Sequence, residues 1–162
     1  MSGKRDSDDQ KREQRYRDQK LVHCIYTAQL KAPLDEVELE AHLQDHYQQV
    51  DAGALTGVSL CEGRRLFHVI EGPEQEVDRL YKTMSIDKVS RQTVKLVHKP
   101  ISQRDFSSMS AAYGEAGKKV FTRLEGNGAP ALPRTRLRSL KNRDTANLLE
   151  QFLEGRWRSR DD

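Results

Sequence analysis

The pattern of apolar residues along the chain predicts four β-strands. The first runs from Leu21 to Ala28 and the last from Thr93 to Lys99. Between them, the apolar runs Val58–Cys61 and Leu66–Ile70 flank a turn that contains Gly63, which predicts a hairpin. Both faces of the second hairpin strand are largely apolar, so we expect it to lie in the interior of a sheet that is covered on both sides.

Two segments with a helical period separate these strands. The first begins at Pro33 and ends before Gly53, and the second begins at Gly72–Glu74. Their apolar stripes are Leu39, Leu43, Tyr47 and Val50 in the first, and Val77, Leu80, Tyr81 and Met84 in the second. The resulting order, βαββαβ, predicts an α+β fold with a ferredoxin-like sheet and both helices on one face.

This fold makes a specific prediction about two polar residues. The first and third strands are neighbours at the centre of a ferredoxin-like sheet. The period of two places Tyr26 and His68 in the layer beneath the helices. We therefore expect the two side chains to lie together. A buried tyrosine and histidine most often satisfy each other's hydrogen bonds, and we favour that interpretation over a proton-coupled pair.

A C-terminal helix is predicted beyond the sheet. Asp144 is suited to cap it and Gly155 to end it. Its apolar face consists of Leu148, Leu149, Phe152 and Leu153. A helix this short needs a docking surface. Two surfaces are open to it: the second face of the sheet, or another protein or subunit. These four residues are the predicted interaction residues.

Composition divides the chain into four parts. Hydrophobic residues make up 35% and charged residues 33% of the 162 positions, and the charges gather at the ends. We expect a disordered charged arm over 1–19 and one domain over 20–113. A linker with a basic excess is expected over 114–142, followed by the helical segment 143–156.

Charge and cysteine content narrow the function classes. The net charge of +3 argues against a dedicated nucleic-acid binder, although the segment Arg134–Arg143 keeps that alternative open. Cys24 and Cys61 lie within apolar strands, which predicts buried free thiols and a cytoplasmic protein. No apolar run approaches the length of a membrane span, so no membrane partner is expected.

Several motifs, in this order of elements, resemble the BLUF family of flavin-dependent blue-light sensors. They are Cys24–Thr27, Leu55–Gly57, Phe67–Gly72, Pro100–Ile101, and Phe106 before Met109–Ser110. The resemblance covers about residues 20–113. It implies a flavin ring between the two helices, a strand-one tyrosine, and a strand-three glutamine that contacts both the tyrosine and the ring.

The positions that the resemblance implies for flavin binding differ in this chain. Tyr26 matches the tyrosine, but His68 stands at the position of the glutamine. Val50 replaces the asparagine that binds the ring edge, and the arginine and histidine of the family fall near Val89 and Ser90. The tryptophan of the family's last strand is replaced by Met109.

These differences change the expected chemistry. A carboxamide presents a donor and an acceptor side by side, whereas neutral imidazole presents them on opposite sides of a rigid ring. Val50 offers the ring no polar contact. Losing the polar contacts of the family's asparagine and arginine weakens flavin binding by roughly 10²–10⁴-fold if the costs add. We therefore expect no cofactor, with FAD kept as the alternative.

Other candidate sites are weaker. Glu38, His42 and His46 share one helix face, which we interpret as a solvated face rather than a metal site. No nucleophile–base set or phosphate loop is evident, so no catalytic residue is predicted.

The leading hypothesis is a non-enzymatic regulatory module that acts through protein contacts or self-association. The alternatives are a flavin photoreceptor with an altered pocket, and a binder of nucleic acids or anionic surfaces.

Overall fold

The computed structural model describes residues 10–11, 16–17, 19–114, 122–123 and 137–157. Most of the predicted arm over 1–19, most of the linker over 114–142 and residues 134–136 of the basic segment lie outside these ranges. The hypothesis of a nucleic-acid binder therefore stays a prediction.

One six-stranded sheet forms the centre of the fold, in the order β4-β1-β3-β2-β5-β6. Its strands are β1 (Leu21–Leu30), β2 (Thr56–Glu62), β3 (Arg65–Pro73), β4 (Ser90–Pro100), β5 (Met109–Gly114) and β6 (Thr122–Arg123). The first four strands pair antiparallel, which confirms the predicted ferredoxin-like arrangement. The apolar pattern did not predict β5, which pairs parallel with β2, or β6 beside it.

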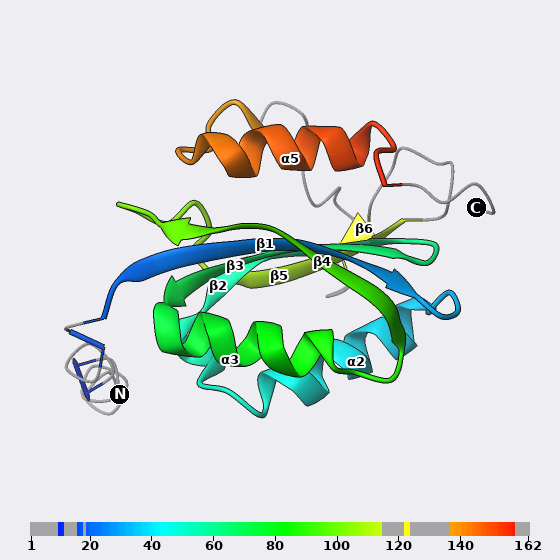
Figure 1. Cartoon of the computed structure of the whole chain (residues 1–162), viewed down its shortest axis with the longest axis horizontal. Coiled ribbons are helices and arrows are strands. Elements are labelled where there is room, and N and C mark those ends of the chain that lie inside the picture. Colours follow the sequence, from blue (N-terminus) through cyan, green and yellow to red (C-terminus); the bar gives the residue numbers. More distant parts are fainter. Residues whose placement is uncertain (1–9, 12–15, 18, 115–121, 124–136, 158–162) are drawn as a thin grey trace.

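Helices cover both faces of the sheet. The helices α2 (Glu36–Tyr47) and α3 (Glu74–Ser85) lie on one face, and α5 (Arg143–Leu153) lies on the other (Figure 1). A short 3-10 helix, η1 (Ala52–Ala54), connects α2 to β2. None of the helices in the described part of the chain is long and apolar enough to span a membrane.

The helix α2 begins three residues later than predicted. Asp35, rather than Pro33, precedes its first turn and accepts a hydrogen bond from the backbone N–H of Glu38 at 2.8 Å. The carboxylate of Glu38 accepts in return from the backbone N–H of Asp35 at 3.3 Å. This reciprocal capping box satisfies two N–H groups that the helix itself leaves without partners. Pro33 therefore lies in the loop that leads to the cap.

Two separate cores lie on the two faces of the sheet, and the alternation of side chains along the strands divides them. Under α2 and α3, Tyr26 of β1 joins Leu66 and Ile70 of β3. On the opposite face, Ile25 of β1 packs with Phe67 of β3 and with residues of α5. This division agrees with the predicted period of two in both strands.

Gly57 at the start of β2 is required by a close approach of two strands. Its φ is +152°, and a Cβ atom here would lie 1.9 Å from the carbonyl oxygen of Val69. Only glycine avoids this overlap, because it has no Cβ. The Leu-Thr-Gly motif thus allows β2 to pair closely with β3.

The predicted C-terminal helix docks on the sheet of its own chain. Leu149 and Phe152 of α5 are fully buried in the second core, and Leu148 and Leu153 pack against its edge. The ring of Phe152 lies 5.2 Å from that of Phe67 on β3. In this arrangement, α5 covers the apolar face that the βαββαβ sheet would otherwise expose.

A buried arginine fixes the end of α5 to the hairpin. The side chain of Arg65 is 2% exposed and forms a salt bridge with Glu62 at 3.0 Å. Its guanidinium donates to the carbonyl oxygens of Phe152 at 2.9 Å and Arg156 at 2.5 Å. It also lies 4.0 Å from the centroid of the Phe152 ring. The positive charge thereby satisfies carbonyl groups at the C-terminal end of the helix, where the dipole favours a cation.

Candidate functional site

The centre of the helix-side core contains a tyrosine–histidine pair. Tyr26 and His68 are direct partners in the register of β1 and β3. The hydroxyl of Tyr26 lies 2.9 Å from Nδ1 of His68, within hydrogen-bond distance. Both side chains are buried, which agrees with the position predicted from the sequence. Two further rings border the pair, Tyr81 at 5.2 Å from Tyr26 and Tyr47 at 6.5 Å from His68.

Burial keeps both members of this pair uncharged. Removal from water, together with the neighbouring His42 and His46, lowers the pKa of His68 to about 3. Burial also raises the pKa of Tyr26 well above its usual value. A neutral phenol next to a neutral imidazole is a stable hydrogen-bonded pair. It carries no ionised group that would promote proton transfer at neutral pH.

Several buried polar atoms on this face of the sheet have no hydrogen-bond partner among the described residues. They include Nε2 of His68, the hydroxyl oxygen of Tyr47, and Oγ of Ser59, which is the partner of His68 in the register of β2 and β3. Burying a polar group without a partner costs about 1–3 kcal/mol. These atoms are therefore the places where a small polar molecule would gain most from binding.

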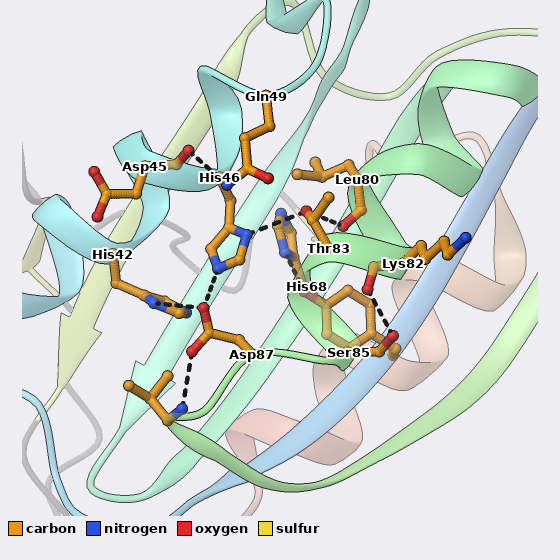
Figure 2. A network of polar contacts seen from close by, with 12 residues as sticks. His42, Asp45, His46, Gln49, His68, Leu80, Lys82, Thr83, Ser85 and Asp87 are labelled. Carbon is orange, nitrogen blue, oxygen red and sulfur yellow. Dashed lines mark hydrogen bonds and ion pairs between the residues drawn. The ribbon is translucent and has the colours of Figure 1, made fainter.

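A histidine joins the two helices above the sheet. His46 of α2 lies with Nδ1 3.1 Å from Oγ1 of Thr83 on α3, and with Nε2 2.6 Å from the carboxylate of Asp87 (Figure 2). Asp87 follows α3 in the loop to β4, and His42 lies 3.9 Å from the same carboxylate oxygen. The predicted solvated face is wrong for His46, which is only 4% exposed, because α3 and its loop cover that side of α2.

The remaining flavin-site positions are apolar or peripheral. Val50 and Met109 pack against the helix-side core, and Val89 does the same from the α3–β4 loop. Ser90 begins β4, and its backbone N–H donates to the carbonyl of Asp87 at 3.3 Å. Of the four predicted cofactor residues, the structure joins Tyr26 and His68 by a hydrogen bond.

A second polar network near the end of β3 was not predicted. The fully buried carboxylate of Glu71 accepts from the hydroxyl of Thr56 and from the backbone N–H groups of Asp105 and Phe106. Arg104 donates to Thr56 at 2.9 Å and to the carbonyl of Glu71 at 3.2 Å. Burial raises the pKa of Glu71. The Ile-Glu-Gly motif contains this residue, but two of its partners, Asp105 and Phe106, lie more than thirty positions later.

The loop between β4 and β5, which contains Arg104 and Asp105, also contacts the segment before α5. The carboxylate of Asp105 accepts from the backbone N–H groups of Lys141 and Asn142, immediately before the helix begins. Its backbone N–H donates to Glu71 at 2.7 Å. Asp105 thus links the end of β3 to the start of the helix on the other face of the sheet.

A cavity of about 580 Å³ lies away from the tyrosine–histidine pair. Lys20, Gly53, Arg104 and Phe106 are among the residues that line it. None of its lining residues belongs to the pair or to the His46 bridge.

Replacing Tyr26 with phenylalanine tests the buried pair. The variant leaves Nδ1 of His68 without its partner in a site where Nε2 already lacks one. We expect a loss of about 1–3 kcal/mol in the free energy of unfolding, measured by urea denaturation. Tyr113→Phe on β5 is the control and should cost less, because that residue is only partly buried. Equal losses in the two variants would contradict a specific role for the pair.

Comparison with known families gives one match. Residues 21–112 match the family described as BLUF, sensors of blue light using FAD. None of the curated protein sequences with which the chain was compared matches it.

Solved structures show the same fold at low sequence identity. The BLUF protein BlrB in its dark state is 20% identical, with a TM-score of 0.53, over 80% of this chain and 84% of BlrB. Klebsiella pneumoniae BlrP1 with FMN and cyclic diGMP is 22% identical, with a TM-score of 0.60, over 83% of this chain and 35% of BlrP1. A bacterial light-regulated adenylyl cyclase is 19% identical, with a TM-score of 0.53, over 83% of this chain and 36% of the cyclase. The chain thus spans about a third of the last two proteins.

Proposed function

Because this chain belongs to the BLUF family of sensors of blue light using FAD, we propose that it is a non-enzymatic regulatory module of that family. In this proposal, the flavin site is filled by the protein's own side chains. The module has lost the usual flavin photochemistry and acts through contacts with another protein or with a second copy of itself. Its buried free thiols, Cys24 and Cys61, are consistent with a cytoplasmic location.

The observation that supports this proposal most strongly is the His46 bridge. In the family, the flavin ring lies between the two helices that correspond to α2 and α3. Here His46 of α2 contacts Thr83 of α3 at 3.1 Å across that space. A ring placed there would have to break this contact and also the one between His46 and Asp87, at 2.6 Å. These two contacts support the proposal that the side chains present do not fit the ring.

The chemistry of the remaining positions supports the same proposal. Val50 is packed with apolar neighbours and offers no hydrogen bond to a ring edge. His68 already uses Nδ1 on Tyr26, which leaves only Nε2 for any ligand. A rigid imidazole cannot exchange donor and acceptor as a rotating carboxamide does. The hydrogen-bond switch of the family thus has no equivalent at His68.

The position of α5 bears on how the module contacts a partner protein. The apolar residues predicted for interaction are Leu148, Leu149, Phe152 and Leu153, and α5 turns them toward its own sheet. We propose that regulation involves the docking of α5. Two polar links control that docking, Arg65 at its end and Asp105 before its start. A partner that loosens either link gains access to the second face of the sheet.

A binding comparison tests the proposal. The variant His46→Ala/Val50→Asn/His68→Gln removes the His46 bridge and restores the two side chains that the family uses to hold the ring. Each recovered polar contact is worth about 1–3 kcal/mol, so we expect the variant to bind FAD at least about 10-fold more tightly than the wild type. Equilibrium dialysis with FAD in the dark measures both affinities. Equal affinities, or tighter binding by the wild type, would contradict the proposal.

A flavin photoreceptor with an altered pocket is the second candidate. The observation that favours it is two of the buried atoms without partners, Nε2 of His68 and the hydroxyl of Tyr47. Both lie in the helix-side core, where a bound ring would satisfy them. In this case the wild-type protein would retain flavin through purification, and Tyr47→Phe would weaken that binding.

A further inference from the structure

We propose that His42, His46 and Asp87 form a binding site for one divalent transition-metal ion, with Zn²⁺ as the first candidate. The site joins α2 to the loop between α3 and β4. It is independent of flavin and goes beyond the function proposed above.

The three ligand groups converge from two separate segments. His42 and His46 are four residues apart on α2, so their side chains project from the same face. Asp87 reaches the same point from the α3–β4 loop (Figure 2). One nitrogen or oxygen from each of the three residues lies within 4.8 Å of the other two. The two imidazole rings have centroids 4.7 Å apart and stand edge to face.

Nδ1 of His46 and Oδ1 of Asp87, which face away from the proposed metal position, already have hydrogen-bond partners. The hydroxyl of Thr83 donates its hydrogen to the carbonyl of Leu80 at 3.0 Å, so it accepts from Nδ1–H of His46. Nε2–H of His46 donates to Oδ2 of Asp87 at 2.6 Å, and a bound metal ion would take the place of that hydrogen. Oδ1 of Asp87 accepts from the backbone N–H of Val89 at 2.8 Å, which leaves Oδ2 for both histidines. Outer hydrogen bonds of this kind orient ligands in protein metal sites.

The geometry requires only a small adjustment to admit an ion. Bonds from zinc to imidazole nitrogen and carboxylate oxygen are about 2.0–2.2 Å long, which places ligand atoms roughly 3.3 Å apart in a tetrahedral site. The present separations from Oδ2 of Asp87 are 2.6 Å to His46 and 3.9 Å to His42. One contact must open and the other close by less than 1 Å each, and Asp87 lies in a loop. The two imidazole nitrogens, which lie within 4.8 Å of each other, must approach by up to about 1.5 Å.

The ligand types select the class of metal. Two imidazoles and one carboxylate suit zinc and its transition-metal neighbours, whereas calcium and magnesium prefer sites made of oxygen. The side chains of His42 and Asp87 are 10% and 23% exposed. Solvent therefore has access to the site and can supply a fourth ligand. Bound metal would lock α2 to the start of β4.

Zinc titration of the full-length protein, without a polyhistidine tag and after chelator treatment, tests this site. We expect one Zn²⁺ per chain in competition with a chromogenic chelator, and a cobalt complex with a visible absorption band. Asp87→Asn and His42→Gln should each weaken zinc binding by about 100-fold or more, because loss of an outer-shell partner alone costs about 10–100-fold.

Asp45→Asn is the matched control. It removes a carboxylate from the same helix, and Figure 2 shows this carboxylate pointing away from Asp87. We expect its zinc affinity to equal that of the wild type. Circular dichroism of every variant without metal establishes that it is folded. The proposal is overturned if the wild type binds no zinc, or if folded Asp87→Asn binds as tightly as Asp45→Asn. Either result would leave the hydrogen bonds of His46, and the proposed function, intact.

Discussion

Replacing Arg65 with methionine is expected to lower the free energy of unfolding by about 3–5 kcal/mol. The variant removes the buried salt bridge at 3.0 Å between Arg65 and the carboxylate of Glu62, which is 3% exposed. It also removes the donors to the carbonyls of Phe152 and Arg156. Urea denaturation measures the loss. Hydrogen exchange should show the greatest increase in α5, because Arg65 fixes the end of that helix.

Two controls separate the buried pair from a general effect of losing an arginine. Arg91→Met removes an exposed arginine on β4 and should change stability by less than about 0.5 kcal/mol. In Glu62→Gln/Arg65→Met the buried negative charge is also gone, so the double variant should be more stable than Arg65→Met alone. A double variant as unstable as the single one would show that the salt bridge is not the cause.

The second large effect is a loss of stability in acid caused by His68. Its pKa is about 3 in the folded protein and near 6.5 in an unfolded chain. Between these values the unfolded state binds more protons, so stability falls as the pH falls. At about 1.4 kcal/mol per pH unit, His68 alone should cost about 3 kcal/mol between pH 7.5 and pH 4.

Comparison with His68→Gln isolates this contribution. Glutamine does not titrate but retains a polar group for Tyr26. The variant should therefore lose less stability than the wild type over the same range. Burial also lowers the pKa of His23 and His42, so part of the acid sensitivity remains in both proteins. Parallel stability curves for the two proteins would contradict a neutral, buried His68.

The sequence alone was enough to predict the central sheet and the contact between Tyr26 and His68. Alternating apolar residues in β1 and β3 determine which side chains share a face, and the order of elements determines which strands are neighbours. Together they placed Tyr26 next to His68, where the structure has a hydrogen bond. Local patterns are sufficient here because each face of these strands is buried.

Contacts between distant segments could not be predicted in this way. His46 is 41 positions from Asp87, and Glu71 is 34 from Asp105, so no periodic pattern relates them. A helix face with Glu38, His42 and His46 resembles an exposed face until the loop that covers it is known. The strand β5 was missed for a related reason, since its small residues pair beside β2 without a strong apolar alternation.

The docking of α5 was left open by the sequence for a physical reason. An amphipathic helix specifies that it needs an apolar surface, but not which one. Leu149 and Phe152 are equally suited to a second chain and to the face that carries Ile25 and Phe67. The buried contacts of Arg65 with Phe152 favour the sheet of the same chain.

The absorption spectrum of the purified wild-type protein tests the central claim most directly. The claim is that side chains of this chain, and above all His46 between α2 and α3, occupy the place of the flavin ring. We predict a colourless protein that remains so after incubation with excess FAD and removal of the free cofactor. A protein that is yellow, or that stays yellow after incubation with FAD, would contradict the claim, and flavin bands that shift reversibly under blue light would favour the photoreceptor alternative.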